Sequence, residues 1–299
     1  MRRTIGVAVA QNIATGAVEG GRLTGKLYAF PGEDSGPESL FTLPAEAISE
    51  QISRQIVAAA DNRQVDAIGA GFPGIIRNGV IEESPNLPQL KGAPMVEFIS
   101  GHLRLAGVTA PLFIYNDADT VAAGLAARRE QLDRNIRVWT LGNGIGLGVY
   151  PHTPGVWEGG HLVVSLDSQE KYCGCGGRGH LEGVMGYRAM RLRFLDMEPE
   201  EVFEQAAHGD PRCADFVKLW HRALAAATAN SIHLAGPGKF LITGYNARHV
   251  DLNLLERYLH EMIKMSPLRS YTVEVVPGGA DLAVVGAAVN AEQAAFPGE

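Results

Sequence analysis

The chain has 299 residues, 46 % of them hydrophobic and 20 % charged, which is typical of a soluble globular protein large enough for two domains. Its formal net charge of −7 argues against nucleic acid as the main partner, because a surface that neutralises phosphates must be basic. No apolar run is long enough to cross a bilayer, and three cysteines without a disulfide pattern indicate a cytoplasmic protein with no membrane partner.

Hydrophobic periodicity and turn residues predict strands and helices that alternate along the chain. In order, we expect strands at 3–9 and 22–30, a loop at 31–37, a helix at 44–60, a strand at 65–71, a helix at 95–105, a strand at 112–115, a helix beginning near Ala118, strands at 137–141 and 146–150, helices at 185–195, 200–207 and 211–234, a strand at 239–243, a helix at 251–265, a strand at 271–276 and a helix at 281–293. The strand pattern restarts near Arg137, which implies two α/β domains.

The segment 158–182 gathers side chains that can bind a metal ion. Cys173 and Cys175 lie on one Gly-rich turn, and a histidine lies near each end of the segment. Structural zinc takes four nitrogen or sulfur ligands, so we predict zinc held by His161, Cys173, Cys175 and His180. The alternative is a loop with reduced thiols and solvated histidines, because a C-x-C pair is less specific than paired C-x-x-C motifs.

The same segment carries a resemblance to a known family. Glu158-x-Gly160-His161, followed by Cys173-x-Cys175-Gly176-x-x-Gly179-His180-x-Glu182, is similar to the signature of the ROK sugar kinases, E-x-G-H and then C-x-C-G-x-x-G-C-x-E. The family's third cysteine is His180 here, and histidine is also a zinc ligand. The resemblance covers nearly the full length. It implies an α/β, two-domain actin-like (ribonuclease-H-like) fold with an interdomain cleft, an N-terminal lobe of residues 1–116 plus about 283–299, and a C-terminal lobe of residues 117–282 with the zinc-type loop.

The resemblance also implies a sugar site. Gly71-Phe72-Pro73-Gly74 and Pro85-Asn86-Leu87 resemble turns that line the family's sugar pocket, and Asn116-Asp117-Ala118-Asp119 resembles its N-D-A-N motif. Asp117 matches the catalytic aspartate, and a carboxylate there can accept the proton of an attacking hydroxyl group. An ordinary helix cap is the alternative, and both roles can hold at once. The implied sugar-binding residues are Gly74, Asn86, Asn116, Glu158, His161 and Glu182.

The nucleotide side departs further from the family. Gly142-Asn143-Gly144 resembles the second phosphate loop, with a hairpin turn as the alternative, and Tyr245 after Gly244 replaces a glycine near the family's adenosine site, where its ring can stack on a base or block it. The family's first loop, D-x-G-G-T, is replaced by Ala8-Val9-Ala10-Gln11-Asn12, which lacks the carboxylate and both glycines. The remaining candidates for contact with the nucleotide are Gln11, Asn12, Gly142, Asn143, Gly144 and Gly244.

These features favour an ATP-dependent kinase of a hexose or an N-acetylhexosamine, with Asp117 as the general base, structural Zn²⁺, and Mg²⁺ accompanying ATP. The alternative is a catalytically weak or inactive sugar-binding or sensing protein derived from the ROK fold, because the phosphate loops are altered. A kinase with another phosphoryl donor, such as polyphosphate, is a third hypothesis. We expect no DNA-binding repressor, since the chain opens directly in its first strand, and the resemblance implies a homodimer.

Overall fold

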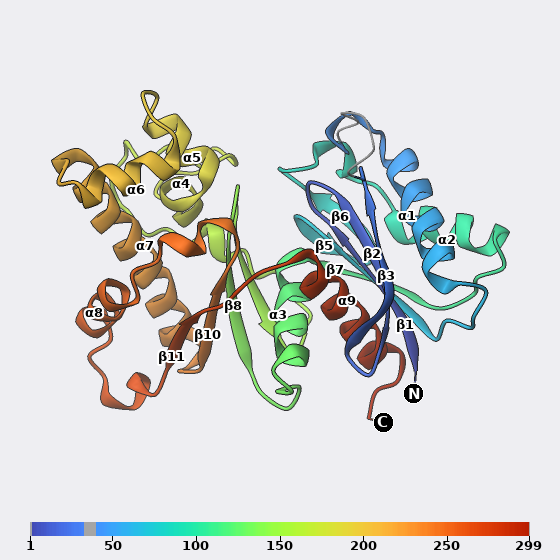
Figure 1. Ribbon diagram of the computed structural model, residues 1–299. Helices are drawn as coiled ribbons and strands as arrows, with labels where there is room; N and C mark the ends of the chain where they lie inside the picture. Colours follow the sequence, from blue (N-terminus) through green and yellow to red (C-terminus); the bar gives the residue numbers. More distant parts are fainter. Residues whose placement is uncertain (1, 33–39, 299) are drawn as a thin grey trace. The chain divides into compact units, whose positions relative to one another are not determined.

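The computed structural model describes residues 2–32 and 40–298 (Figure 1). Residues 33–37 of the expected loop lie outside the described residues. The chain divides into two compact units: unit 1 comprises Met1–Arg134, Gly148–Val156 and Gly279–Glu299, and unit 2 comprises Asn135–Leu147 and Trp157–Gly278. This division differs from the expected boundary at residue 117, because the helix that begins there belongs to unit 1.

Unit 1 is built on a five-stranded sheet in the order β3-β2-β1-β4-β7, and it also contains a two-stranded ribbon, β5-β6, which lies between β4 and β7 in the sequence. β1, β2 and β3 pair in antiparallel fashion, whereas β1, β4 and β7 are parallel. The strands are β1 (Arg3–Val9), β2 (Ile13–Glu19), β3 (Arg22–Phe30), β4 (Ala67–Phe72), β5 (Ile75–Arg77), β6 (Val80–Glu83) and β7 (Leu112–Asn116), and the helices are α1 (Ala45–Ala60), α2 (Met95–Leu105), α3 (Asp117–Arg128) and α9 (Ala280–Ala295).

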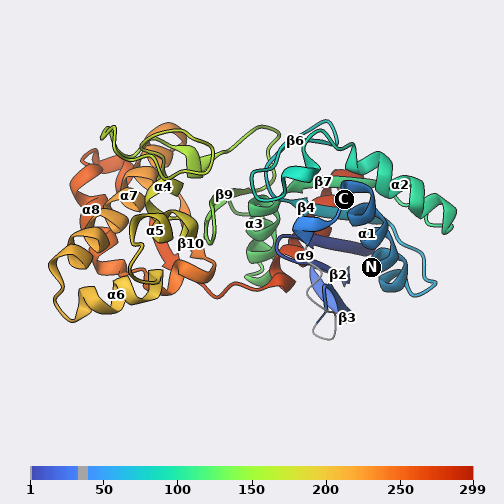
Figure 2. The same cartoon turned by 90° about the horizontal axis from the view of Figure 1, so that it is seen from above.

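The two faces of this sheet are covered by different helices (Figure 1). Ile5, Val7 and Val9 of β1 are buried in one core with residues of α1 and α2. Because successive side chains alternate across a strand, Gly6 and Ala8 face the other side, where α9 packs against β1 and β4 and α3 packs against α9. Figure 2 shows α3 and α9 side by side from a second direction.

Glycines bring α9 into backbone contact with its neighbours. A Cβ atom at Gly6 or Gly69 would lie within 1.9 Å of a carbonyl oxygen of α9. One at Gly124 of α3 or Gly286 of α9 would lie within 2.0 Å of a carbonyl oxygen of the other helix. No side chain fits such distances, so α3 is fixed to unit 1 through main-chain contacts.

Unit 2 contains a four-stranded sheet in the order β11-β10-β8-β9, in which β8, β10 and β11 are parallel. β9 begins in unit 2 and ends in unit 1. The strands are β8 (Ile136–Leu141), β9 (Ile145–Tyr150), β10 (Lys239–Thr243) and β11 (Thr272–Val275), and the helices are α4 (Leu181–Met185), α5 (Tyr187–Arg193), α6 (Pro199–Ala207), α7 (Pro211–Ala235) and α8 (Leu252–Met262). Trp139 of the sheet and Trp220 of α7 belong to the core of this unit.

The structure differs from the sequence-based elements in three places. β2 is absent from the expected elements because its sequence, IATGAVE, is rich in small residues that have low strand propensity. The β5-β6 ribbon is likewise absent from the expected elements. The expected helix at 185–195 corresponds to α5, and α4, which precedes it, is absent from the expected elements; the extended backbone of Gly186 separates the two helices. Within the described ranges, no helix has the length and apolar character that spanning a membrane requires.

A buried histidine joins α7 to the start of α8. The Nδ1 of His221 bonds to the carbonyl oxygen of Val217 at 2.8 Å, and its Nε2 accepts the backbone N–H of Asp251, the N-cap residue of α8, at 2.8 Å. Both bonds require the neutral ring, with its hydrogen on Nδ1. Burial lowers the pKa of His221 below its ordinary value.

We expect this histidine to make the protein less stable in acid. Because its pKa is lower in the folded than in the unfolded state, its contribution is complete above about pH 6.5 and is lost as the pH falls toward the folded-state pKa. His221→Phe should cost about 1–3 kcal/mol at pH 8 by leaving the Asp251 N–H unpaired. It should also flatten the pH dependence between pH 7 and 5, as measured by urea unfolding.

The matched control is His233→Phe, at an exposed position of the same helix. It should change the free energy of unfolding by less than about 0.5 kcal/mol, which is usual for surface positions. An equal loss in the two variants, or an unchanged pH profile for His221→Phe, would contradict the assignment.

Candidate functional site

The first group of candidate residues lies at the start of α3 in unit 1. Asp117 is the first residue of the helix, directly after the parallel strand β7. The Oδ1 of Asn116 accepts the N–H of Ala118 at 2.9 Å, and its Nδ2 donates to the carbonyl oxygen of Gly74 at 3.0 Å. The hydroxyl of Thr120 donates to the carbonyl oxygen of Asp117 at 2.7 Å. These bonds fix the backbone that carries the Asp117 carboxylate.

Gly74 comes directly before the β5-β6 ribbon in the sequence, and Asn86 comes shortly after it. Gly74 has a positive φ of 111°, and a Cβ atom there would lie 2.0 Å from the carbonyl oxygen of Glu83. Only glycine is compatible with both conditions. Ser84 donates to the carbonyl oxygen of Pro73 at 2.8 Å and so closes the ribbon. Asn86, two residues further, is exposed.

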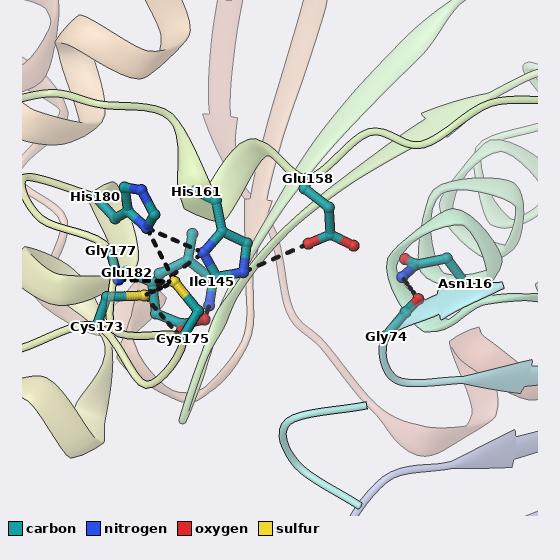
Figure 3. A network of polar contacts seen from close by, with 10 residues as sticks. All are labelled: Gly74, Asn116, Ile145, Glu158, His161, Cys173, Cys175, Gly177, His180 and Glu182. Carbon is teal, nitrogen blue, oxygen red and sulfur yellow. Dashed lines mark hydrogen bonds and ion pairs between the residues drawn. The ribbon is translucent and has the colours of Figure 1, made fainter. Parts of the chain in front are cut away.

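The four predicted metal ligands meet in unit 2 (Figure 3). Their ligand atoms all lie within 4.8 Å of one another. Nδ1 of His161 lies 3.3 Å from Nδ1 of His180 and 3.5 Å from Sγ of Cys173, and Sγ of Cys175 lies 3.4 Å from Sγ of Cys173 and 3.3 Å from Nδ1 of His180. A tetrahedral zinc ion with bonds of about 2.0–2.3 Å has ligands about 3.3–3.8 Å apart. The four atoms therefore match a zinc site in donor type and in spacing.

Burial sets the protonation of two of these ligands. Burial raises the pKa of the Cys173 thiol to about 12, so without a cation this sulfur keeps its proton. Burial and the neighbouring His161 lower the pKa of His180, which favours the neutral ring that binds metals. Metal binding at this cluster would therefore release a proton from Cys173.

Two carboxylates flank the cluster (Figure 3). The Oε2 of Glu158 lies 3.7 Å from Nε2 of His161, the ring nitrogen that does not face the other ligands. The Oε2 of Glu182 accepts the N–H of Ile145 at 3.1 Å, and its Oε1 lies 3.6 Å from Sγ of Cys173. The expected sugar-binding residues of unit 2, Glu158, His161 and Glu182, thus lie together around the cluster.

The candidate phosphate loop of unit 2 is the turn between β8 and β9. The N–H of Gly142 donates to the carbonyl oxygen of Gly144 at 3.0 Å, and Asn143 between them is exposed. The carbonyl oxygen of Gly142 accepts the N–H of Tyr187 at 3.0 Å and the Nδ2 of Asn246 at 3.3 Å. The loop is therefore a hairpin turn, held from outside by residues of two other segments.

Tyr245 lies on the segment that follows β10, directly after Gly244. Its ring is 56 % exposed, its hydroxyl donates to Glu200 at 2.8 Å, and the guanidinium of Arg248 lies 3.9 Å from the ring centre. Tyr187 contacts it edge to face at 6.1 Å. Sequence reasoning missed Tyr187 and Asn246, which contact the Gly142–Gly144 turn, and Arg248, which contacts Tyr245, because nothing in the sequence signals these contacts.

The turn between β1 and β2 carries the residues compared above with the family's first phosphate loop. The N–H of Ala10 donates to the carbonyl oxygen of Asn12 at 2.9 Å. Gln11, at the tip, is exposed. The amide of Ala10 is therefore engaged within the turn itself.

A partly buried ion pair attaches the loop that carries Cys173 and Cys175 to α5. Nη1 of Arg193 donates to Oε1 of Glu170 at 3.0 Å, and Nη2 contacts Oε2. The two side chains are 17 % and 10 % exposed, and the guanidinium lies over the ring of Tyr172 at 4.5 Å. The carbonyl oxygen of Glu170 also accepts the N–H of Gly179 at 2.7 Å. The pair thus anchors the segment that carries both cysteines.

The fold is that of the ROK sugar kinases, a mixed α/β actin-like fold. The ROK hexokinase from Thermus thermophilus matches with a TM-score of 0.79 over 98 % of both chains, at 23 % sequence identity. The expected fold class is therefore confirmed.

The ROK family profile matches residues 38–294, and the chain belongs to the ROK family. A glucokinase from Pyrobaculum calidifontis is 28 % identical over 253 residues, which cover 79 % of this chain and 81 % of the relative. An N-acetylmannosamine kinase from Haemophilus influenzae is 27 % identical over 239 residues, which cover 75 % and 77 %. The family predicted from the motifs is confirmed.

Loss of the Glu170–Arg193 pair should destabilise unit 2. Arg193→Gln should lower the free energy of unfolding by about 3 kcal/mol, because it leaves a mostly inaccessible carboxylate without its partner. Arg191→Gln on the same helix is the control: its ion pair with Glu198 is about half exposed, and its loss should cost less than about 1 kcal/mol. Urea unfolding measures both costs, and equal values would show that the pair contributes no more than a surface contact.

Proposed function

We propose that the protein transfers a phosphoryl group from ATP to a hydroxyl group of a hexose or an N-acetylhexosamine, with Asp117 as the general base. Its relatives are kinases of glucose and of N-acetylmannosamine. The observation that carries the proposal is the fixed start of α3, where Asn116 bonds to Gly74 and Thr120 bonds to the carbonyl oxygen of Asp117. A base positioned in this way can accept a hydroxyl proton without reorganisation.

Each group of residues has a separate task in this proposal. In unit 1, the Asp117 carboxylate accepts the proton of the attacking hydroxyl, and Gly74, Asn86 and Asn116 bind neighbouring hydroxyl groups. In unit 2, Glu158, His161 and Glu182 supply further donors and acceptors. A site built to bond these hydroxyls discriminates against ligands that lack them, because its polar groups would be left unpaired.

We assign the nucleotide to the edge of unit 2 that carries Gly142, Asn143, Gly144 and Gly244. Backbone N–H groups of such a loop suit phosphate oxygens, and the exposed ring of Tyr245 is a stacking surface for a base. Thr243 and Asn246 support this assignment, since each has a buried oxygen without a hydrogen-bond partner among the described residues. Mg²⁺ accompanies ATP in such kinases and neutralises phosphate charge. At the end of β1, Ala8 stands where the family has a carboxylate that assists this ion.

A sugar-binding protein with weak or no turnover is the second candidate. It is favoured by the β1–β2 turn, where Ala10 and Gln11 carry Cβ atoms in place of glycines. Gln11 and Asn12 remain as side-chain donors to phosphate. Phosphoryl transfer depends on positioning and charge neutralisation, so this turn weakens the donor side and leaves the sugar side intact.

We further propose that His161, Cys173, Cys175 and His180 bind one structural zinc ion. The support is the set of contacts between 3.3 and 3.5 Å that joins the four ligand atoms. All four positions would be filled by the protein, as in structural zinc sites. The ion would hold Glu158 and Glu182 near each other on a segment with little regular secondary structure.

Protein purified without added zinc should contain about one zinc equivalent per chain, because structural sites of this type bind tightly. Cys175→Ala should lose the metal, whereas Cys213→Ala, which removes a thiol outside the cluster, should retain it. Mass spectrometry of the metal content and urea unfolding with and without a chelator measure both outcomes. Protein that lacks zinc and is indifferent to the chelator would favour the loop of free thiols.

Asp117→Asn should lower turnover by about 10²–10⁴-fold, the usual contribution of a general base. The sugar dissociation constant should change by less than about threefold, because asparagine keeps the shape and one acceptor oxygen. A coupled assay with ATP-Mg and a panel of hexoses and N-acetylhexosamines gives turnover, and calorimetry gives sugar and nucleotide affinity.

Asp215→Asn, at an exposed position of α7, is the matched control and should alter neither quantity. Sugar binding without turnover by the unmodified protein would replace the kinase by the second candidate. Failure to bind any sugar of the panel would overturn both.

A further inference from the structure

A buried carboxylate two residues beyond Asp117 has no task in the proposed reaction. Asp119 of α3 is 6 % exposed. Its Oδ1 accepts the backbone N–H of Val149 in β9 at 2.9 Å, and its Oδ2 lies 3.5 Å from Nδ1 of His152. An acidic residue in the first turn of a helix is stabilised by the helix dipole at the surface. The helix dipole alone therefore does not explain why the Asp119 carboxylate is buried against Val149 and His152.

His152 lies between this carboxylate and a buried tyrosine. Its ring meets that of Tyr115 edge to face, with centres 5.0 Å apart and planes at 77°. Among the residues that the structure describes, neither Nδ1 of His152 nor the hydroxyl of Tyr115 has a hydrogen-bond partner, although both are buried. The Oδ2 of Asp119 is thus the acceptor placed for His152, and the contact with Tyr115 limits the movement of its ring.

The backbone of β9 touches the first turn of α3 at the same point. A Cβ atom at Gly148 would lie 1.9 Å from the carbonyl oxygen of Ala118, the residue between the two aspartates. Val149 and His152 follow Gly148 closely in the chain. The segment from Gly148 to His152 therefore contacts α3 in three ways. The backbone of Gly148 touches that of Ala118, the N–H of Val149 bonds to Asp119, and the ring of His152 faces the Asp119 carboxylate.

We propose that Asp119 and His152 form a positioning pair for Asp117. Through the Val149 N–H and the His152 ring, the Asp119 carboxylate holds the first turn of α3 against the end of β9. It thereby fixes the direction in which Asp117, one residue from Ala118, presents its carboxylate. This role rests on the proposed function, in which Asp117 is the base, and neither residue of the pair touches substrate.

The substitutions separate the two contacts of Asp119. Asp119→Asn keeps an oxygen for the Val149 N–H but removes the charge that faces His152, whereas Asp119→Ala removes both. His152→Phe keeps a ring against Tyr115 and removes the nitrogen. Asp281→Asn is the matched control, because it breaks an ion pair with Arg128 at the opposite end of α3.

The first experiment measures turnover and the KM for sugar. Asp119→Ala and His152→Phe should each lower kcat about tenfold, the equivalent of one hydrogen bond to a charged group. Asp119→Asn should give an intermediate value, and KM should change less than about twofold in all three variants, since no sugar contact is lost. Because the two residues act together, the double variant Asp119→Ala/His152→Phe should be no slower than Asp119→Ala.

The second experiment measures amide hydrogen exchange in the first turn of α3 and requires no turnover. Exchange there should be about tenfold faster in Asp119→Ala and His152→Phe, and unchanged in Asp281→Asn. Unchanged exchange in both pair variants, multiplicative losses of kcat in the double variant, or an equal effect of Asp281→Asn would overturn the positioning role. If the unmodified protein phosphorylates no sugar, the proposed function fails, and the exchange result alone decides whether the pair holds α3.

Discussion

The main-chain contact of α9 with β1, β4 and α3 determines where the candidate base lies. Glycines at 6, 69, 124 and 286 bring these elements to distances that no side chain could occupy. Such main-chain contacts cannot adjust by rotamer changes, whereas contacts between flexible side chains can. The start of α3 is therefore fixed by backbone geometry, and the Asn116–Gly74 and Thr120–Asp117 hydrogen bonds orient the residues that emerge from it.

The two candidate phosphate-binding turns each contain one internal hydrogen bond, and they differ in how other segments of the protein hold them. In the β1–β2 turn the N–H of Ala10 donates to the carbonyl oxygen of Asn12, and in the β8–β9 turn the N–H of Gly142 donates to that of Gly144. At the Gly142–Gly144 turn, the carbonyl oxygen of Gly142 is held by Tyr187 and Asn246, which stiffens the loop from outside. In the proposed function, the Gly142–Gly144 turn of unit 2 therefore positions the phosphates of ATP more than the turn after β1 does.

The sequence predicts most of the regular elements because their apolar residues follow helical or strand periodicity, as in α1 and β8. It predicts that His161, Cys173, Cys175 and His180 lie together, because all four lie within one short segment, where residue type and spacing suffice. It does not predict β2, whose small residues carry little strand signal, or the neighbours of the Gly142 turn. Tyr187, Asn246 and His152 reach their partners only through the tertiary fold, and no local pattern encodes such contacts.

The two nitrogens of His161 face different partners, Nδ1 toward the ligand cluster and Nε2 toward Glu158. A metal ion on Nδ1 would leave the ring a single tautomer, with its hydrogen on Nε2. The ring would then be an obligate donor on the side of Glu158, at any pH at which the metal stays bound. The metal cluster would thus determine that Nε2 of His161 donates rather than accepts a hydrogen bond. In the proposed function, this ring faces sugar hydroxyls.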